Sequence, residues 1–260
     1  MLPSIFISHG SPMLPLTDSP ARDFMSGLGA AIEVAHGRPR AILVASAHWE
    51  TGTPMVNSVA RNQTIYDFRG FPKALYDLSY PAPGDPALAE RVSDLLCAAG
   101  LPSGIDHASG LDHGAWNPLL LAWPKADIPV VQVSVQSHLG PAHHLQLGQA
   151  LAPLRDEGVL VLGSGSWTHD LRRFRGQAID APESPDVAAF SEWMDTALAE
   201  GRRCDLLTYR HKAPFAEQQH PTEEHLLPLY VAMGAGGPRA RRLHSSASYG
   251  ILRMDAYAFE

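Results

Sequence analysis

Short apolar runs alternate along the chain with longer segments in which apolar residues recur at helical spacing. The short runs predict buried strands, because they are apolar on both faces and too short for typical helices. They occupy residues 2–8, 41–47, 128–135 and 159–162, and an alternating pattern predicts a last strand over 246–258. Helices are predicted over residues 20–35, 86–99, 142–156 and 184–200. Strands that alternate with helices favour an α/β fold.

Three of the predicted strands lead into a histidine. His9 and His48 directly follow the first two strands, and His169 follows the strand at 159–162. A fourth histidine, His225, lies where Thr222 is expected to cap a short helix. Ligands of open α/β sheets bind beyond the carboxyl ends of the strands, so these histidines are expected to converge.

Two segments break the alternation. Residues 61–86 are irregular and rich in aromatic residues, proline and glycine, which fits a functional loop over a pocket. A loop that merely covers an edge of the core fits equally well. The glycine-rich stretch 163–166 lacks the lysine of a phosphate-binding loop and the order of a nucleophile elbow. We interpret it as a tight turn.

The composition limits the classes of function that this chain could have. The chain has 260 residues, of which 45% are hydrophobic and 18% charged, as in a packed globular enzyme. No linker divides it, so residues 1–260 are expected to form one domain. The net charge of −7 argues against a nucleic-acid partner, and the arginine clusters at 172–175 and 239–242 are expected to be solvated. No apolar run approaches the ~20 residues of a membrane span, so we expect a cytoplasmic protein without membrane association.

Histidine is unusually frequent. There are thirteen histidines against three lysines, which suggests metal ligands, although surface histidines alone would give the same excess. Neutral imidazole suits zinc and iron, and a further histidine could act as an acid or base because its pKa lies near neutrality. The two cysteines, Cys97 and Cys204, make no disulfide framework, and Cys97 is expected in the core.

In combination and order, seven motifs resemble the class III extradiol ring-cleavage dioxygenases, in the branch of DOPA 4,5-dioxygenases. The resemblance covers nearly the whole chain. The motifs are His9-Gly10-Ser11-Pro12, Ser46-Ala47-His48-Trp49, Tyr66-Asp67-Phe68-Arg69-Gly70-Phe71-Pro72, Tyr80-Pro81-Ala82-Pro83-Gly84, Asp112-His113-Gly114, residues 163–169 and Pro221-Thr222-Glu223-Glu224-His225.

The resemblance implies a single α/β domain with a central mixed, largely parallel sheet flanked by helices. It implies a metal held by His9, His48 and His225, with Glu224 as the alternative third ligand. Fe(II) is expected for activity, and Zn(II) could be present in purified protein.

The substrates implied are a small catechol, DOPA or a related compound, and O2. His169 is the implied acid/base, close enough to become a fourth ligand, and His113 is the implied histidine on the substrate side. His169 would take a hydroxyl proton and return it as the ring opens. Trp49, Phe71 and Trp116 are candidate walls for a flat substrate, and ordinary core positions fit them equally.

Two residues depart from the family pattern. Glu223 stands where proline is expected, and could alter the charge of the site or face water. Asp170 stands where asparagine is expected, and could support His169 or point away. Two alternative functions use the same residues: a zinc-dependent hydrolase, and a non-catalytic interaction protein resembling Memo.

Overall fold

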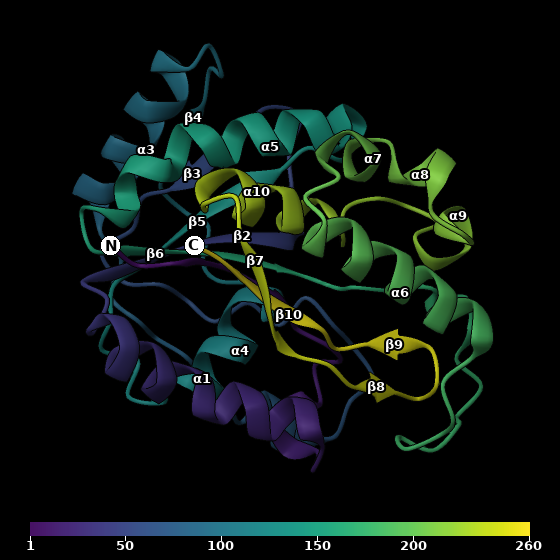
Figure 1. The fold of residues 1–260 in the computed structure, drawn as a ribbon. Helices are drawn as coiled ribbons and strands as arrows, with labels where there is room; N and C mark the ends of the chain where they lie inside the picture. The colour runs from purple at the N-terminus through teal and green to yellow at the C-terminus, as the bar shows by residue number, and fades with distance from the viewer.

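An eight-stranded mixed sheet runs through the middle of the molecule in this computed structural model, which describes residues 1–260 (Figure 1). Strands β1, β6, β2 and β5 are parallel neighbours, whereas β10 and β3 are antiparallel to β1 and β5. In sheet order the strands are β4 (Gly104–Asp106), β3 (Met55–Asn57), β5 (Val130–Val135), β2 (Ala41–Glu50), β6 (Val159–Gly165), β1 (Ser4–Ser8), β10 (Ala256–Phe259) and β7 (Ala240–His244). The predicted α/β class with a mixed, largely parallel sheet is confirmed.

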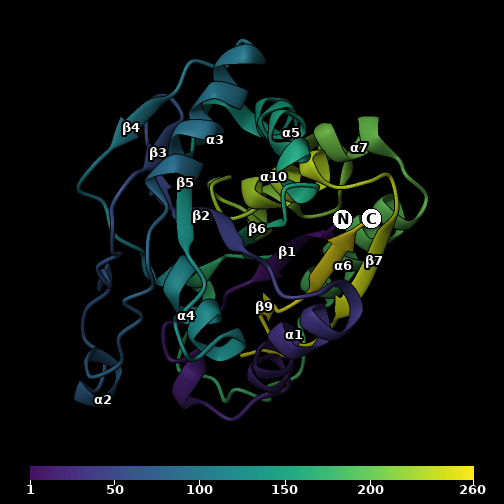
Figure 2. The same cartoon turned by 90° about the vertical axis from the view of Figure 1, so that its left-hand side faces the viewer.

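Helices cover both faces of the sheet (Figures 1 and 2). One face carries α1 (Pro20–His36) and α4 (His113–Ala122). The other carries α3 (Pro86–Ala98), α5 (Gly140–Leu151) and α10 (Leu227–Ala235), with α6 (Pro185–Ala199) beside them. The remaining helices are short: α2 (Lys73–Tyr76), α7 (Arg203–Leu207), α8 (Tyr209–Lys212) and α9 (Ala216–Gln219).

The core follows from the pleat of the strands. Successive side chains of β2 point to opposite faces, so Ile42 and Val44 pack with α1 and α4 while Leu43 and Ala45 pack with α3 and α5. All four are buried. The continuous apolar runs in the sequence are therefore the strands with helices on both sides.

The first helices begin where local chemistry favours a start. The Ser19 side chain accepts a hydrogen bond from the Arg22 N–H at 3.2 Å, and Pro20 occupies the first turn of α1. The Asp85 side chain caps α3 in the same way through the Leu88 N–H at 3.0 Å. With these caps, both helices begin at the predicted residues, Pro20 and Pro86.

Other predictions were wrong. Residues 246–258 form the hairpin of β8 (Ala247–Ser248) and β9 (Leu252–Arg253) and then β10, because Tyr249 and Gly250 both adopt positive φ and turn the chain. Cys97 lies on the exposed side of α3. The glycine-rich stretch is the end of β6 instead of a turn.

No helix combines the length and the apolar character needed to cross a membrane.

Candidate active site

His9 and His48 emerge at the carboxyl ends of two parallel strands that flank β6. The His9 N–H donates to the Gly165 carbonyl of β6 at 2.9 Å. In β2 the pairing with β5 skips from Ala45–Val133 to Glu50–Val135, so residues 46–49 bulge from the ladder. His48 lies within this bulge, near the end of β2.

The side chains of His9, His48 and His225 converge on one point. Nε2 of His48 lies 3.1 Å from Nε2 of His9 and 3.3 Å from Nε2 of His225. Two nitrogen ligands bonded to one metal ion at about 2.1 Å lie about 3 to 3.4 Å apart. The three ring nitrogens thus have the spacing that a shared metal requires.

The opposite nitrogen of each ring faces an oxygen. Nδ1 of His9 lies 3.2 Å from Ser164 Oγ, and Nδ1 of His48 lies 3.4 Å from Asp67 Oδ2. Nδ1 of His225 lies 2.9 Å from Glu224 Oε1. Such partners behind metal-binding histidines fix the ring orientation and raise the basicity of the inner nitrogen.

Burial keeps the three rings neutral. Burial, reinforced by the neighbouring histidines, holds the pKa of His9 and of His225 well below the ordinary value of 6.5. Burial likewise lowers the pKa of His48 to about 3. Neutral imidazoles keep a lone pair for a cation, and a donor set of three imidazoles suits iron or zinc. The residues present therefore fit the metal that the sequence predicts.

His225 lies in a turn before α10 and not in the first turn of a helix as predicted. Thr222 caps no helix, and its hydroxyl donates to Glu224 at 2.9 Å. The turn lies directly against β6: a Cβ on Gly165 would come within 2.1 Å of the His225 carbonyl oxygen. The Ser166 N–H donates to that same carbonyl at 2.7 Å. Glycine in β6 is what allows this close approach.

His113 begins α4 beside His48. Asp112 caps the helix by accepting from the Ala115 N–H at 3.2 Å, and it also accepts from Ser46 Oγ at 2.6 Å. The ring centroids of His113 and His48 are 3.9 Å apart. This cap ties the start of α4 to β2 and so fixes the distance between the two histidines.

Asp67 connects His113 and His48. Its Oδ2 lies 2.8 Å from Nδ1 of His113, and its Oδ1 accepts the His113 backbone N–H at 3.0 Å. Burial alone raises the pKa of Asp67, but the hydrogen bonds from His113 outweigh this and hold the pKa below its ordinary value. A carboxylate from the irregular loop therefore supports two site histidines.

His169 stacks on His225. The rings are 3.4 Å apart between centroids and 12° from parallel. Ligand atoms of His169, Glu224 and His225 lie within 4.8 Å of one another. The inner nitrogens of His9 and His48 belong instead to the group of three convergent nitrogens that they form with His225. His225 belongs to both groups, so His169 lies next to the three convergent nitrogens. Burial lowers the pKa of His169 to about 4.

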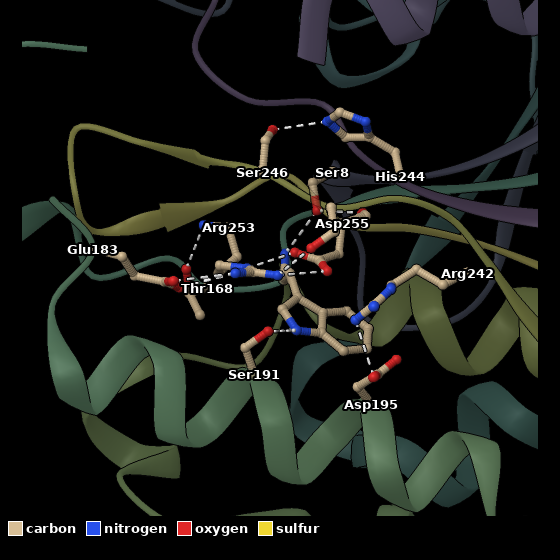
Figure 3. A network of polar contacts seen from close by, with 12 residues as sticks. Ser8, Thr168, Glu183, Ser191, Asp195, Arg242, His244, Ser246, Arg253 and Asp255 are labelled. Atoms are coloured by element: carbon tan, nitrogen blue, oxygen red, sulfur yellow. Dashed lines mark hydrogen bonds and ion pairs between the residues drawn. The ribbon is translucent and has the colours of Figure 1, made fainter. Parts of the chain in front are cut away.

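A polar network holds the segment that leads to His169 (Figure 3). The Trp167 N–H donates to Ser8 Oγ at 3.0 Å, and Ser8 Oγ donates to the Asp255 carbonyl at 2.9 Å. Thr168 Oγ1 accepts from the Arg253 N–H at 2.9 Å. The segment is therefore anchored to β1 and to the C-terminal strands.

The two residues that depart from the family pattern, Asp170 and Glu223, are bound to side chains outside the histidine cluster. Asp170 binds Arg172, with Oδ1 2.7 Å from Nε. Glu223 accepts from the Tyr209 hydroxyl at 3.2 Å and lies 3.7 Å from Arg210. Neither carboxylate contacts a site histidine through these bonds.

A cavity of about 560 Å³ opens beside the histidines. His9, His48, His113 and His169 line it. Its apolar wall consists mainly of six residues: Phe68, Phe71, Leu171, Phe174, Tyr249 and Leu252. Phe71 is thus at the cavity as predicted, whereas Trp116 is fully buried in the core and Trp49 does not line the cavity.

The irregular segment 61–86 does both things the sequence left open. Phe68 and Phe71 line the cavity, while Leu75, Tyr80 and Ala82 are fully buried in the core. The sequence did not assign a role to Asp67 or to Phe68. Both stand in the motif of residues 66–72, so that motif was the signal that could have found them.

The chain is similar to known proteins over nearly its whole length. Residues 3–259 match the family model described as the catalytic LigB subunit of aromatic ring-opening dioxygenase. The chain is 49% identical over 260 residues to a protein of Beta vulgaris named 4,5-DOPA dioxygenase extradiol, covering 98% of this chain and 96% of that one. It is 41% identical to a protein of the same name from Escherichia coli K12, covering 90% and 85% of the two chains.

A solved structure has the same fold. It is the crystal structure of an uncharacterized protein from Escherichia coli K12, with a TM-score of 0.80 and 32% sequence identity over the whole of both chains.

Proposed function

Because the chain belongs to the family of the catalytic LigB subunit of aromatic ring-opening dioxygenases, and is an extradiol ring-cleavage dioxygenase, we propose that it opens a catechol ring with histidine-bound Fe(II). The observation that carries this proposal is the convergence of three neutral histidine nitrogens beside a largely apolar cavity. An aromatic substrate and O2 follow from the family. The names of the relatives support DOPA or a related catechol as the substrate.

His9, His48 and His225 are the proposed ligands, with Glu224 as the residue that orients His225. When bound, Fe(II) would supply the redox chemistry that couples a catecholate to O2, which zinc lacks. The distances between the inner nitrogens and the oxygen partner behind each ring support this ligand set.

His169 is the proposed acid/base. Its pKa of about 4 leaves the ring neutral at neutral pH, so it can accept a proton from a catechol hydroxyl and return it during ring opening. Stacking on His225 orients the ring. The same shift makes neutral His169 a weaker base and its imidazolium a stronger acid than an ordinary histidine, so the shift favours the return of the proton over its removal.

His113 is proposed to hydrogen-bond the substrate. Its Nδ1 faces Asp67, which leaves Nε2 for a group in the cavity. Asp67 fixes the tautomer and the direction of the ring, as carboxylates do behind functional histidines.

The test is O2 uptake by metal-free protein reloaded with Fe(II) or Zn(II). With a catechol, the iron-loaded enzyme should consume O2 and form a yellow semialdehyde, and the zinc-loaded protein should do neither. His169→Ala should lower kcat by about 10²- to 10⁴-fold with its metal retained. His48→Ala should lose the metal. His138 is an exposed histidine outside the site, so His138→Ala should change neither kcat nor the metal content.

Absence of O2 uptake by the iron-loaded enzyme across a panel of catechols would overturn this proposal. A zinc hydrolase on the same ligands would instead work with zinc and without O2. The Memo-like, non-catalytic alternative is set aside, since the chain belongs to a family of enzymes.

A further inference from the structure

Two segments that carry site histidines are joined by backbone hydrogen bonds. The His169 N–H donates to the Gln219 carbonyl at 2.8 Å, and the Ser166 N–H donates to the His225 carbonyl at 2.7 Å. The proposed acid/base and the proposed third ligand therefore belong to one hydrogen-bonded pair of segments.

The side chain of His220 adds a third bond between these segments. Its Nε2 lies 2.9 Å from the Trp167 carbonyl oxygen. A carbonyl oxygen only accepts, so this nitrogen carries the proton of the ring. Burial lowers the pKa of His220 to about 4, which keeps the imidazole neutral with this single N–H. Nδ1 has no hydrogen-bond partner among the groups of the protein, so the bond to Trp167 is the one hydrogen bond of the side chain.

His220 is itself held by residues outside the cavity. Its ring is fully buried, with its centroid 5.7 Å from that of Phe190 and 6.3 Å from that of Tyr209. Its carbonyl accepts from Arg210 Nη1 at 2.8 Å. None of these residues lines the cavity, so His220 supports Trp167 from behind the site.

Trp167 is held on both sides of its α-carbon. Its N–H donates to Ser8 Oγ at 3.0 Å, and its carbonyl accepts from His220. Because each peptide unit is planar, the first bond orients the peptide that enters Trp167 and the second orients the peptide that leaves it toward His169. His220 therefore acts on the side of Trp167 that leads to the proposed acid/base.

Stacking fixes only part of the position of His169. The centroid distance of 3.4 Å to His225 sets the separation of the two rings. Stacked ring faces form no directional bond, so stacking alone allows the His169 ring to slide in its plane. Hydrogen bonds are directional, and those of the adjoining main chain supply the missing restraint. A general base must lie within hydrogen-bond reach of the proton that it takes, so this in-plane position determines turnover.

We propose that His220 is a positioning residue for ring opening, which fixes the in-plane position of His169 on His225 through the Trp167 carbonyl. The inference rests on the proposed acid/base role of His169 and adds to the reaction a residue that lies outside the cavity. A displacement of about 1 Å can cost an enzyme about 10²-fold in rate. Loss of the bond should therefore lower kcat without removing a metal ligand or a residue of the cavity wall.

The test compares three replacements of His220 in the iron-loaded enzyme. His220→Gln can place an amide N–H near the position of Nε2 and keep the bond to Trp167, whereas His220→Leu and the shorter His220→Asn cannot. We expect His220→Leu and His220→Asn to lower kcat per bound iron by about 10- to 100-fold, with KM and iron content within about threefold of wild type. His220→Gln should retain kcat within about threefold. If His220→Leu does not fold, His220→Asn gives the same comparison.

Crystal structures of the zinc-loaded proteins give a readout that needs no turnover. The His169 ring should be displaced by about 0.5 Å or more in His220→Leu and His220→Asn, and should keep its wild-type position in His220→Gln. If the wild-type enzyme turns over no catechol, the proposed reaction fails, while this displacement still decides whether His220 positions His169. The two failures are therefore distinguishable.

His144→Leu is the matched control. His144 is equally buried, and its ring is bonded to the Gly140 carbonyl at 2.7 Å and to the Gln136 N–H at 3.1 Å, but it does not line the cavity. This variant should lose stability and keep wild-type kcat per bound iron. An unmoved His169 ring or wild-type kcat in both His220→Leu and His220→Asn would overturn the inference. So would a kcat in His220→Gln as low as in those two variants.

Discussion

Glu224 lies behind His225: its Oε1 is 2.9 Å from Nδ1 of that ring, while Nε2 of the ring is 3.3 Å from Nε2 of His48. The carboxylate and the neighbouring histidines thus contact opposite nitrogens of one imidazole. This arrangement favours His225 as the third ligand and gives Glu224 a supporting role.

Replacing Glu224 should therefore weaken the metal site without abolishing it. Glu224→Gln should raise the Kd for Fe(II) by about 10- to 100-fold, the usual cost of losing a partner behind a ligand, whereas His225→Ala should lose the ion. Metal titration of the two apo-proteins measures this. Glu223→Gln is the control, since Glu223 contacts Tyr209 and Arg210 instead. The reverse order, with His225→Ala still binding iron and Glu224→Gln not, would make Glu224 the ligand.

Asp67 should matter more for turnover than for metal content. Asp67→Asn removes the charge shared by His113 and His48, so we expect kcat to fall by about 10- to 100-fold with most of the metal retained. Steady-state kinetics and elemental analysis of one preparation provide the two readouts. Asp77→Asn, in the same irregular segment but paired with exposed Lys73, should behave as wild type. An Asp67→Asn enzyme with full activity would remove Asp67 from the site.

Gly165→Ala should disturb His225 through the backbone. The added Cβ would meet the His225 carbonyl at 2.1 Å, so β6 or the turn must move, at a cost of about 1 to 3 kcal/mol in the free energy of unfolding. Denaturant unfolding should show this loss, together with weaker metal binding. Gly27→Ala in α1 is the control in which a Cβ is added to open space, because it would meet nothing within 4 Å. This variant should be more stable than wild type by about 0.5 to 1 kcal/mol in the free energy of unfolding. Wild-type stability and metal binding in Gly165→Ala would contradict the packing described here.

The sequence predicted the parts of the fold that depend on continuous apolar runs. The strands that lead to His9 and His48 are buried on both faces, so their pattern is unambiguous. Strand β7 was missed because it lies at the edge of the sheet, where Arg241 and Arg242 face solvent. The end of β6 is a strand instead of the predicted turn because its glycines are needed for distant contacts: Gly165 approaches the His225 carbonyl and Gly163 the Pro228 carbonyl, both at least sixty residues further along the chain.

The site was predictable in its residues but not in its supporting contacts. Strand ends and family motifs indicated all five histidines, and the structure brings them together. The role of Asp67 depends on where an irregular loop lies over α4, which no local pattern encodes. Trp116 was a candidate wall of the cavity because aromatic residues suit cores and pockets equally. Its core position is held by a tertiary contact, the hydrogen bond from its indole N–H to the Ile65 carbonyl, which the sequence does not reveal.

Acid should destabilise the protein partly through His144. Burial lowers the pKa of His144 to about 4, and its Nε2 accepts the Gln136 N–H at 3.1 Å. The unfolded chain, with an ordinary pKa of 6.5, binds the proton first as the pH falls. The stability that neutral His144 contributes is therefore present above pH 6.5 and is lost between pH 6.5 and about 4. The shift corresponds to about 3 kcal/mol in the free energy of unfolding.

The comparison of wild type with His144→Gln isolates this effect. Denaturant unfolding of metal-free protein should show the variant less stable at pH 7.5, with the difference shrinking as the pH approaches 4.5. The exposed His138→Gln should show no such convergence. A difference that stays constant with pH would mean that His144 does not titrate on unfolding.

The most direct test of the central claim is the fate of ¹⁸O-labelled O2 in the product of the iron-loaded enzyme with a catechol. An extradiol dioxygenase places one atom of O2 in the new carboxylate and the other in the aldehyde of the ring-opened product. The carboxylate label should persist in mass spectra, and the aldehyde label should persist when the product is reduced at once to the alcohol, before it exchanges with water. His48→Ala, without its metal, should give no product. A product that carries no label, or that forms equally well without O2, would contradict the proposed function.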